Sequence, residues 1–290
     1  MIIPSVPEPG EHLFRTSDGF LLDYFVRGSG PPLIILPPAW GIGSFYLQDG
    51  LADLEEKFTL IYLEFRSNAK STRRNSEFMT SRHLADDVEA LRQELKLDTI
   101  PRLMGHSGGG TIALWYAIRY PEKVDSLVLL NHQLEDFDDS QSMGDVLAQK
   151  RQDPRFHPAL EAWTSSWDDL SDFEFAETIK KFLPVYFYDP SRASTSPLAT
   201  LTEGPLWNYQ MLHGKYRRAK CQEENLEKVK AKTLTIFSRE DPICTPTQGE
   251  ATKQGIEGSK LVVLEKCGHF PWMEKKEQTL DEITHFFEEK

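Results

Sequence analysis

The stretch LMGHSGGG, Leu103–Gly110, decides the fold. It holds the pattern G-x-S-x-G between a short apolar run, Pro101–Met104, and a longer stretch, Gly109–Tyr120, that ends before Pro121. The run predicts a strand and the longer stretch a helix, so Ser107 lies on a sharp turn between them. The glycines let strand and helix pass closely, and the free N–H groups at the helix start suit a developing oxyanion. In this context the pattern predicts that Ser107 is a nucleophile.

A serine hydroxyl is a weak nucleophile unless a neighbouring base takes its proton. His269 follows the apolar run Leu261–Leu264, and a loop at the end of that predicted strand can reach the serine turn. Asp241 follows the run Thr233–Phe237 and is expected to orient the imidazole. The chain order serine, aspartate, histidine is typical of this kind of turn. We therefore predict a catalytic triad.

Two further positions bear on which residue is the acid of the predicted triad. Glu240 directly precedes Asp241 and is its nearest rival. Asn131 follows an earlier predicted strand, where an acid might otherwise stand, and it is neutral. That neutrality favours Asp241 as the third member of the triad.

Short apolar runs alternate with amphipathic stretches along most of the chain, which predicts a mostly parallel, doubly wound α/β sheet. The predicted strands are Phe20–Arg27, Pro32–Leu36, Thr59–Leu63, Pro101–Met104, Ser126–Leu130, Thr233–Phe237 and Leu261–Leu264; the predicted helices are His83–Leu95, Gly109–Tyr120 and Glu277–Glu288. The alternation stops at 134–222, a segment rich in aromatic and acidic residues. We predict a helical cap there, over a core made of 1–133 and 223–290.

The composition excludes several classes of function. The net charge of −12 disfavours nucleic acid and anionic membranes as partners, because both carry phosphates. Three separate cysteines, Cys221, Cys244 and Cys267, predict neither a disulfide framework nor a zinc site. The chain shows no apolar run of the length of a signal peptide or a membrane span. We expect a soluble, cytoplasmic protein that acts on a small molecule.

Three segments resemble the α/β-hydrolase superfamily: Leu103–Gly110, Tyr120–Val124 and Gly268–Glu274. The resemblance runs from about Phe14 to the C-terminus, and within the superfamily the proline iminopeptidase-like branch is the nearest in look. It implies the α/β-hydrolase fold, a cap inserted after the sixth strand, and triad chemistry that needs neither cofactor nor metal.

The chain departs from these relatives in the loop after Leu36. Many relatives carry His-Gly there, whereas this chain reads Pro37-Pro38-Ala39-Trp40-Gly41. Proline has no N–H to donate. By position, the backbone N–H of Ala39 is the expected oxyanion donor, together with that of Gly108. Trp40, His132, Trp163 and Trp207 are the candidates for contact with substrate.

The second departure follows the strand Thr59–Leu63. Relatives often read Asp-x-Arg-Gly-x-Gly-x-Ser, and in this chain the segment Glu64–Ser71 keeps only the acid, Arg66 and Ser71. Loss of both glycines changes one wall of the pocket and leaves the substrate open.

Several activities fit these residues. The first is hydrolysis of an ester, lactone or related acyl bond in a small molecule with an apolar or aromatic body. The second is an aminopeptidase, which needs a cap carboxylate such as Glu174, Glu177 or Glu203 to hold the substrate ammonium. A C–C bond hydrolase and a non-catalytic receptor of the same fold keep the same triad. Epoxide hydrolases and dehalogenases fit less well, because they place Asp at the position of Ser107.

Overall fold

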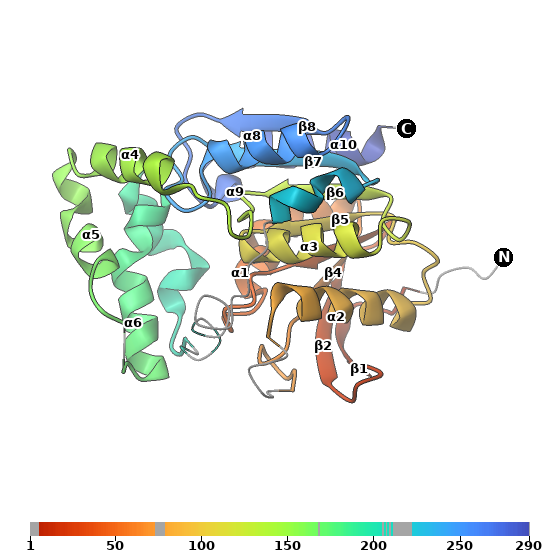
Figure 1. Cartoon of the computed structure of the whole chain (residues 1–290). Helices are drawn as coiled ribbons and strands as arrows, with labels where there is room; N and C mark the ends of the chain where they lie inside the picture. The colour runs from red at the N-terminus through yellow and green to blue at the C-terminus, as the bar shows by residue number, and fades with distance from the viewer. Residues whose placement is uncertain are drawn as a thin grey trace.

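The fold is built on a single eight-stranded sheet with helices on both faces (Figure 1). The computed structural model describes residues 6–72, 79–167, 169–204, 206, 208, 210 and 222–289. The strands are β1 (Gly10–Arg15), β2 (Leu21–Arg27), β3 (Pro32–Leu36), β4 (Thr59–Glu64), β5 (Leu103–His106), β6 (Ser126–Leu130), β7 (Lys232–Ser238) and β8 (Lys260–Leu264). Their order in the sheet is β1-β2-β4-β3-β5-β6-β7-β8.

The sheet is antiparallel at one edge and parallel elsewhere. Strand β2 pairs antiparallel with both β1 and β4, and every pairing from β4 to β8 is parallel. Parallel strands end at a common edge, so the loops after β3, β5, β7 and β8 converge there. The predicted mostly parallel, doubly wound sheet is therefore confirmed.

Helices cover the two faces of the sheet with separate apolar clusters. On one face, α2 (Ser81–Glu94) and α3 (Gly108–Arg119) contribute Leu84, Val88 and Trp115. On the other face, α1 (Phe45–Gly50), α9 (Pro271–Glu274) and α10 (Lys276–Glu288) pack against the sheet. In this fold both faces are buried, which is why most strands read as continuous apolar runs.

Two of the elements that the sequence patterns missed show why they were missed. Strand β1 is an edge strand in which only Phe14 is buried, so it carries no apolar run. Helix α8 (Pro246–Gly255), which lies between β7 and β8, buries mainly Pro246, Gln248, Gly249 and Thr252 rather than large apolar side chains. In both elements the burial comes from tertiary packing that a local hydrophobic pattern does not reveal.

Between β6 and β7 the described residues form helices and turns with no strand (Figure 1). These elements are α4 (Ser140–Lys150), η3 (Pro154–Phe156), α5 (His157–Trp163), α6 (Asp172–Phe182), η4 (Leu183–Tyr186), η5 (Pro190–Thr195), η6 (Pro197–Thr200) and η7 (Gln222–Lys228). Phe175, Phe182, Tyr186 and Phe187 of this segment are buried in the same cluster as α1 and α9. Most of its aromatic residues thus serve packing. No helix in the described ranges is long and apolar enough to cross a bilayer.

Candidate active site

Ser107 stands on a strained turn between β5 and α3. Its φ of 55° lies in the left-handed region, which a non-glycine residue adopts at a cost of about 1–3 kcal/mol. A Cβ added to Gly105 would come within 2.4 Å of the Gly109 carbonyl oxygen, and one added to Gly109 within 2.1 Å of the Leu36 carbonyl oxygen. The glycines are required because strand, turn and helix pass this closely.

The predicted base and acid meet in the structure. His269 Nδ1 lies 2.6 Å from Asp241 Oδ2, and both side chains are buried. The imidazole comes from the loop after β8 and the carboxylate from the loop after β7. A carboxylate on Nδ1 holds that proton and leaves Nε2 as the proton acceptor. This arrangement can activate a serine hydroxyl.

The described residues show no hydrogen bond between Ser107 Oγ and His269, although both residues line one pocket. Catalytic hydrogen bonds of this kind are often long before substrate binds. The structure therefore brings Ser107 and His269 to the same cavity.

Asn131 is a functional residue that the sequence reasoning missed. Its Nδ2 donates to Asp241 Oδ2 over 2.7 Å, and the backbone N–H groups of Ile243 and Cys244 donate to Oδ1. Together with His269 these donors hold the carboxylate in one orientation. The rival Glu240 faces elsewhere and accepts the Cys267 N–H over 2.8 Å.

His106, within the G-x-S-x-G pattern, turns away from the nucleophile. Its Nε2 lies 2.9 Å from the His269 carbonyl oxygen, so Nε2 is the donor, and Nδ1 accepts from Tyr46 Oη over 2.8 Å. Burial, with the nearby His269, lowers the pKa of His106 well below its usual value, which keeps the ring neutral. His106 therefore holds the backbone of His269.

Glu274 ties the catalytic loop to the cap segment. Its carboxylate accepts N–H groups from Gly268 over 2.7 Å, from Tyr188 over 3.1 Å and from Asp189 over 3.0 Å. The His269 N–H also donates to the Tyr186 carbonyl oxygen over 2.6 Å. The loop of the base and the segment after η4 are thus held as one unit.

The pocket above Ser107 is lined by both the core and the cap. The core side consists of Pro38, Trp40, Ile42, Tyr46, His106, Ser107, His269 and Phe270, and the cap side of Ile179, Phe182, Leu183, Tyr186 and Leu198. None of these lining residues is a carboxylate. The cavity suits a neutral, apolar group.

The four candidates for substrate contact do not all lie at the pocket. Trp40 lines the pocket. Trp163 lies one layer behind it, edge-on to Phe182 and Tyr186, which do line it. The structure places His132 away from the pocket, because its Nε2 pairs with Thr252 Oγ1 over 2.9 Å. Burial lowers the pKa of His132 to about 3. Trp207 lies outside the described residues.

The loop after β3 approaches the helix that follows the nucleophile. A Cβ on Gly108 would lie 3.5 Å from the Pro38 Cβ, and Ala39 is buried beside it in the chain. Behind this loop, Glu64 Oε1 accepts both the N–H and the hydroxyl of Ser44. Burial raises the pKa of Glu64 to about 7. The acid kept after β4 therefore supports the expected oxyanion loop rather than facing substrate.

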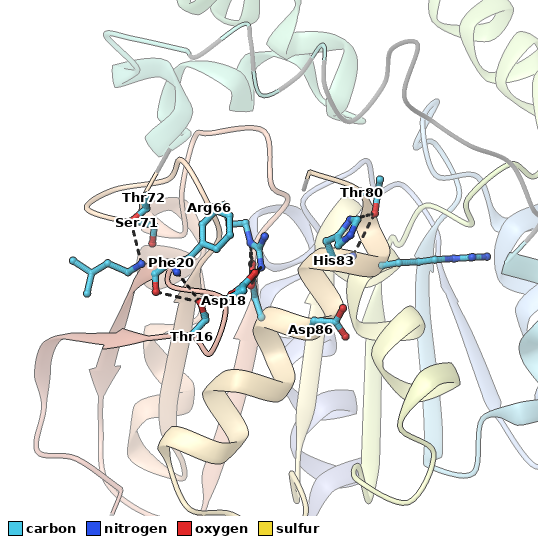
Figure 2. A network of polar contacts seen from close by, with 12 residues as sticks. Thr16, Asp18, Phe20, Arg66, Ser71, Thr72, Thr80, His83 and Asp86 are labelled. Atoms are coloured by element: carbon cyan, nitrogen blue, oxygen red, sulfur yellow. Dashed lines mark hydrogen bonds and ion pairs between the residues drawn. The ribbon is translucent and has the colours of Figure 1, made fainter. Parts of the chain in front are cut away.

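The other two kept residues of that segment also support structure. Arg66 makes a buried ion pair with Asp87. Its guanidinium lies over the Phe20 ring (Figure 2). Ser71 Oγ donates to the Glu64 carbonyl oxygen and accepts the Asp23 N–H, each over 2.8 Å. Side-chain contacts with β2 and α2 therefore hold the segment Glu64–Ser71 in place, and glycines do not shape it.

Comparison with known proteins identifies the family of the chain. A family model described as alpha/beta hydrolase fold matches residues 31–276. The chain is 23% identical to the AB hydrolase superfamily protein YclE of Bacillus subtilis (strain 168), over 90% of this chain and 93% of that protein. It is 24% identical to a proline iminopeptidase of Lactobacillus crispatus (strain ST1), over 91% and 92% respectively.

Solved structures share the fold. The esterase RhEst1 from Rhodococcus sp. ECU1013 superposes with a TM-score of 0.73 at 20% identity, over 96% of this chain and 98% of that one. The resemblance predicted from the motifs, including the likeness to proline iminopeptidases, is confirmed. The chain belongs to the α/β-hydrolase fold family.

Proposed function

We propose that this hydrolase is a serine hydrolase that cleaves an ester, lactone or related acyl bond in a small, neutral molecule with an apolar body. The contact of 2.6 Å between His269 Nδ1 and Asp241 Oδ2, beside the strained Ser107, carries the proposal. The apolar lining of the pocket supports the choice of substrate.

In the proposed reaction, Ser107 Oγ attacks the substrate carbonyl and His269 Nε2 takes its proton. The N–H groups of Ala39 and Gly108 bind the tetrahedral oxyanion, helped by the start of α3. His269 returns the proton to the leaving group, and water then releases the acyl-enzyme by the same steps. The segment 134–222 acts as the cap that closes the apolar side of the pocket.

An aminopeptidase is the second candidate, supported by the similarity to a proline iminopeptidase. It needs an acid that faces the substrate ammonium. Glu174 is exposed and engaged in a capping box with Ser171, and Glu177 pairs with Lys180. Glu203 is exposed as well. None of the three lines the described pocket, which favours the neutral substrate.

The test combines active-site labelling with a substrate panel. A fluorophosphonate probe is expected to label wild-type protein at Ser107, as located by peptide mass spectrometry, and Ser107→Ala is expected to lose label and turnover. Ser165→Ala, which changes an exposed serine, serves as the matched control. Label on another residue with full activity in Ser107→Ala would contradict the proposal.

The panel pairs aryl esters and lactones with prolyl anilides, each with a free and an acylated amine. Neutral esters or lactones are expected to be the better substrates, with no gain from a free amine. A preference for the free amine of about 10²-fold or more, lost on mutation of a cap acid, would favour the aminopeptidase instead.

A further inference from the structure

Cys244 lies against the proposed triad although triad chemistry does not use it. It follows Asp241 by three residues, and its backbone N–H donates to Asp241 Oδ1 over 3.2 Å. The sulfur, a carboxylate oxygen of Asp241 and a ring nitrogen of His269 all lie within 4.8 Å of one another. All three side chains are at least 98% buried. A thiol, an imidazole and a carboxylate therefore converge on one point.

These donor types form a set with a known preference. Sulfur, imidazole nitrogen and carboxylate oxygen together are the ligands that Zn²⁺ takes in proteins, at about 2.0–2.3 Å. Around a tetrahedral ion such ligand atoms stand roughly 3.3–3.6 Å apart, so atoms that lie within 4.8 Å of one another have to close by at most about 1.5 Å. If Nδ1 and Oδ2 are the ligand atoms, their present contact of 2.6 Å has to widen. Water from the pocket or the Ser107 hydroxyl can fill the fourth position.

We propose that Asp241, Cys244 and His269 form an inhibitory site for a thiophilic divalent cation, of which Zn²⁺ is the representative. Binding forms a metal–sulfur bond and releases the thiol proton to solvent, with no change of oxidation state. The imidazole gives a nitrogen lone pair to the metal. If Nδ1 binds the metal, the hydrogen bond between His269 and Asp241 is lost. If Nε2 binds it, His269 can no longer accept the Ser107 proton.

The metal-free protein is consistent with an active enzyme. Burial raises the pKa of the Cys244 thiol well above its usual value, so the sulfur is protonated and is no rival to Ser107 as nucleophile. The inhibition rests on the proposed catalytic roles, whereas metal binding does not.

Cys267 provides a matched control. It is equally buried, but its sulfur lies 3.3 Å from Ser238 Oγ and is no member of the converging group. Removal of either thiol costs similar packing. Only removal of Cys244 removes a ligand.

The experiment titrates chelator-treated full-length protein with ZnCl₂ and follows two readouts. Calorimetry measures binding, and the rate of fluorophosphonate labelling measures the reactivity of Ser107. Wild type and Cys267→Ala are expected to bind one Zn²⁺ and to lose labelling, with recovery on addition of EDTA. Cys244→Ala is expected to bind at least about tenfold more weakly and to keep labelling.

Cobalt titration of the wild type keeps the test independent of how the variants fold. Co²⁺ is expected to produce a thiolate-to-cobalt charge-transfer band. Absence of that band, absence of binding, or equal inhibition of Cys244→Ala and wild type would overturn the proposal. Protein that binds zinc but never labels would contradict the serine hydrolase while leaving the metal site intact.

Discussion

The two walls of the pocket differ in chemistry. On the core wall the polar groups are buried and hydrogen-bonded: His269 to Asp241, His106 to Tyr46, and Glu64 to Ser44. On the cap wall the side chains that face the cavity are apolar or aromatic. Glu174, which is exposed, and Glu177, which is partly exposed, do not line it. Under the proposed function, bond cleavage falls to the core and the selection of substrate shape to the cap.

The largest effect is expected at the core wall. His269→Ala removes the base and should lower kcat by roughly 10⁴-fold or more, and Asp241→Asn should cost a similar or somewhat smaller factor. Steady-state kinetics on the best ester of the panel measures both. Glu240→Gln is the control, because Glu240 accepts the Cys267 N–H and faces away from the imidazole. An inactive Glu240→Gln beside an active Asp241→Asn would reassign the acid.

A smaller effect of the core wall depends on pH. The pKa of Glu64 is raised from 4.5 to about 7 in the folded protein, so the folded state holds the proton more tightly than the unfolded state. The corresponding stability is fully present below about pH 4.5 and is lost as pH rises through about 7. The complete loss is on the order of 3 kcal/mol.

Glu64→Gln cannot ionise, and its stability should therefore fall less steeply than that of the wild type between pH 5 and pH 8. Urea unfolding at several pH values measures the difference in slope. Asp23, whose pKa is also raised, is unchanged in both proteins and is common to both curves. Parallel curves would show that ionisation of Glu64 does not contribute.

The next largest effect is expected at Glu274, where the loop that carries His269 meets the segment after η4. Glu274→Gln replaces a carboxylate that accepts three N–H groups with an amide that has one acceptor oxygen. A loss of about 1–3 kcal/mol in unfolding free energy is expected, because N–H groups, two of them in part-buried hydrogen bonds, lose a charged acceptor. Denaturant unfolding measures it, with Glu277→Gln on the surface of α10 as control. Equal stability of the two variants would refute the role of this junction.

The smallest effect is expected on the cap wall. Glu174→Gln and Glu177→Gln should change kcat/KM for neutral esters by less than about twofold, because surface charges of this kind contribute little. The same kinetics on the free-amine anilides gives the sharper comparison. A selective loss on those substrates would place an ammonium site in the cap and reverse the contrast between the walls.

The sequence predicted the core wall better than the cap. The serine turn and most strands follow from local patterns, because a strand buried on both faces must be apolar and the turn must have glycines. The contacts of Asn131 and Glu274 could not be predicted from the sequence. Asp241, the partner of Asn131, lies 110 residues away along the chain, and Tyr188, one partner of Glu274, lies 86 residues away. No local pattern records such contacts.

His132 shows the opposite failure. Its place directly after β6 predicts a pocket residue, but the chain turns at Asn131, which has a positive φ of 37°, and the ring packs against Phe237. Position after a strand predicts the edge of the sheet and not the direction of the side chain. The side-chain amide of Asn131, rather than the imidazole of His132, points toward Asp241.

The carboxylate of Glu274 has a consequence for protein engineering. Caps are attractive modules to exchange between relatives when a new substrate range is wanted. Here an internal stretch of the predicted cap segment 134–222, Tyr186–Asp189, is bonded to the loop that carries His269. A chimera cut on sequence boundaries alone would separate the N–H groups of Tyr188 and Asp189 from the Glu274 carboxylate and misplace His269. A transplanted cap therefore has to supply its own N–H partners for the Glu274 carboxylate, or the graft has to begin after Asp189.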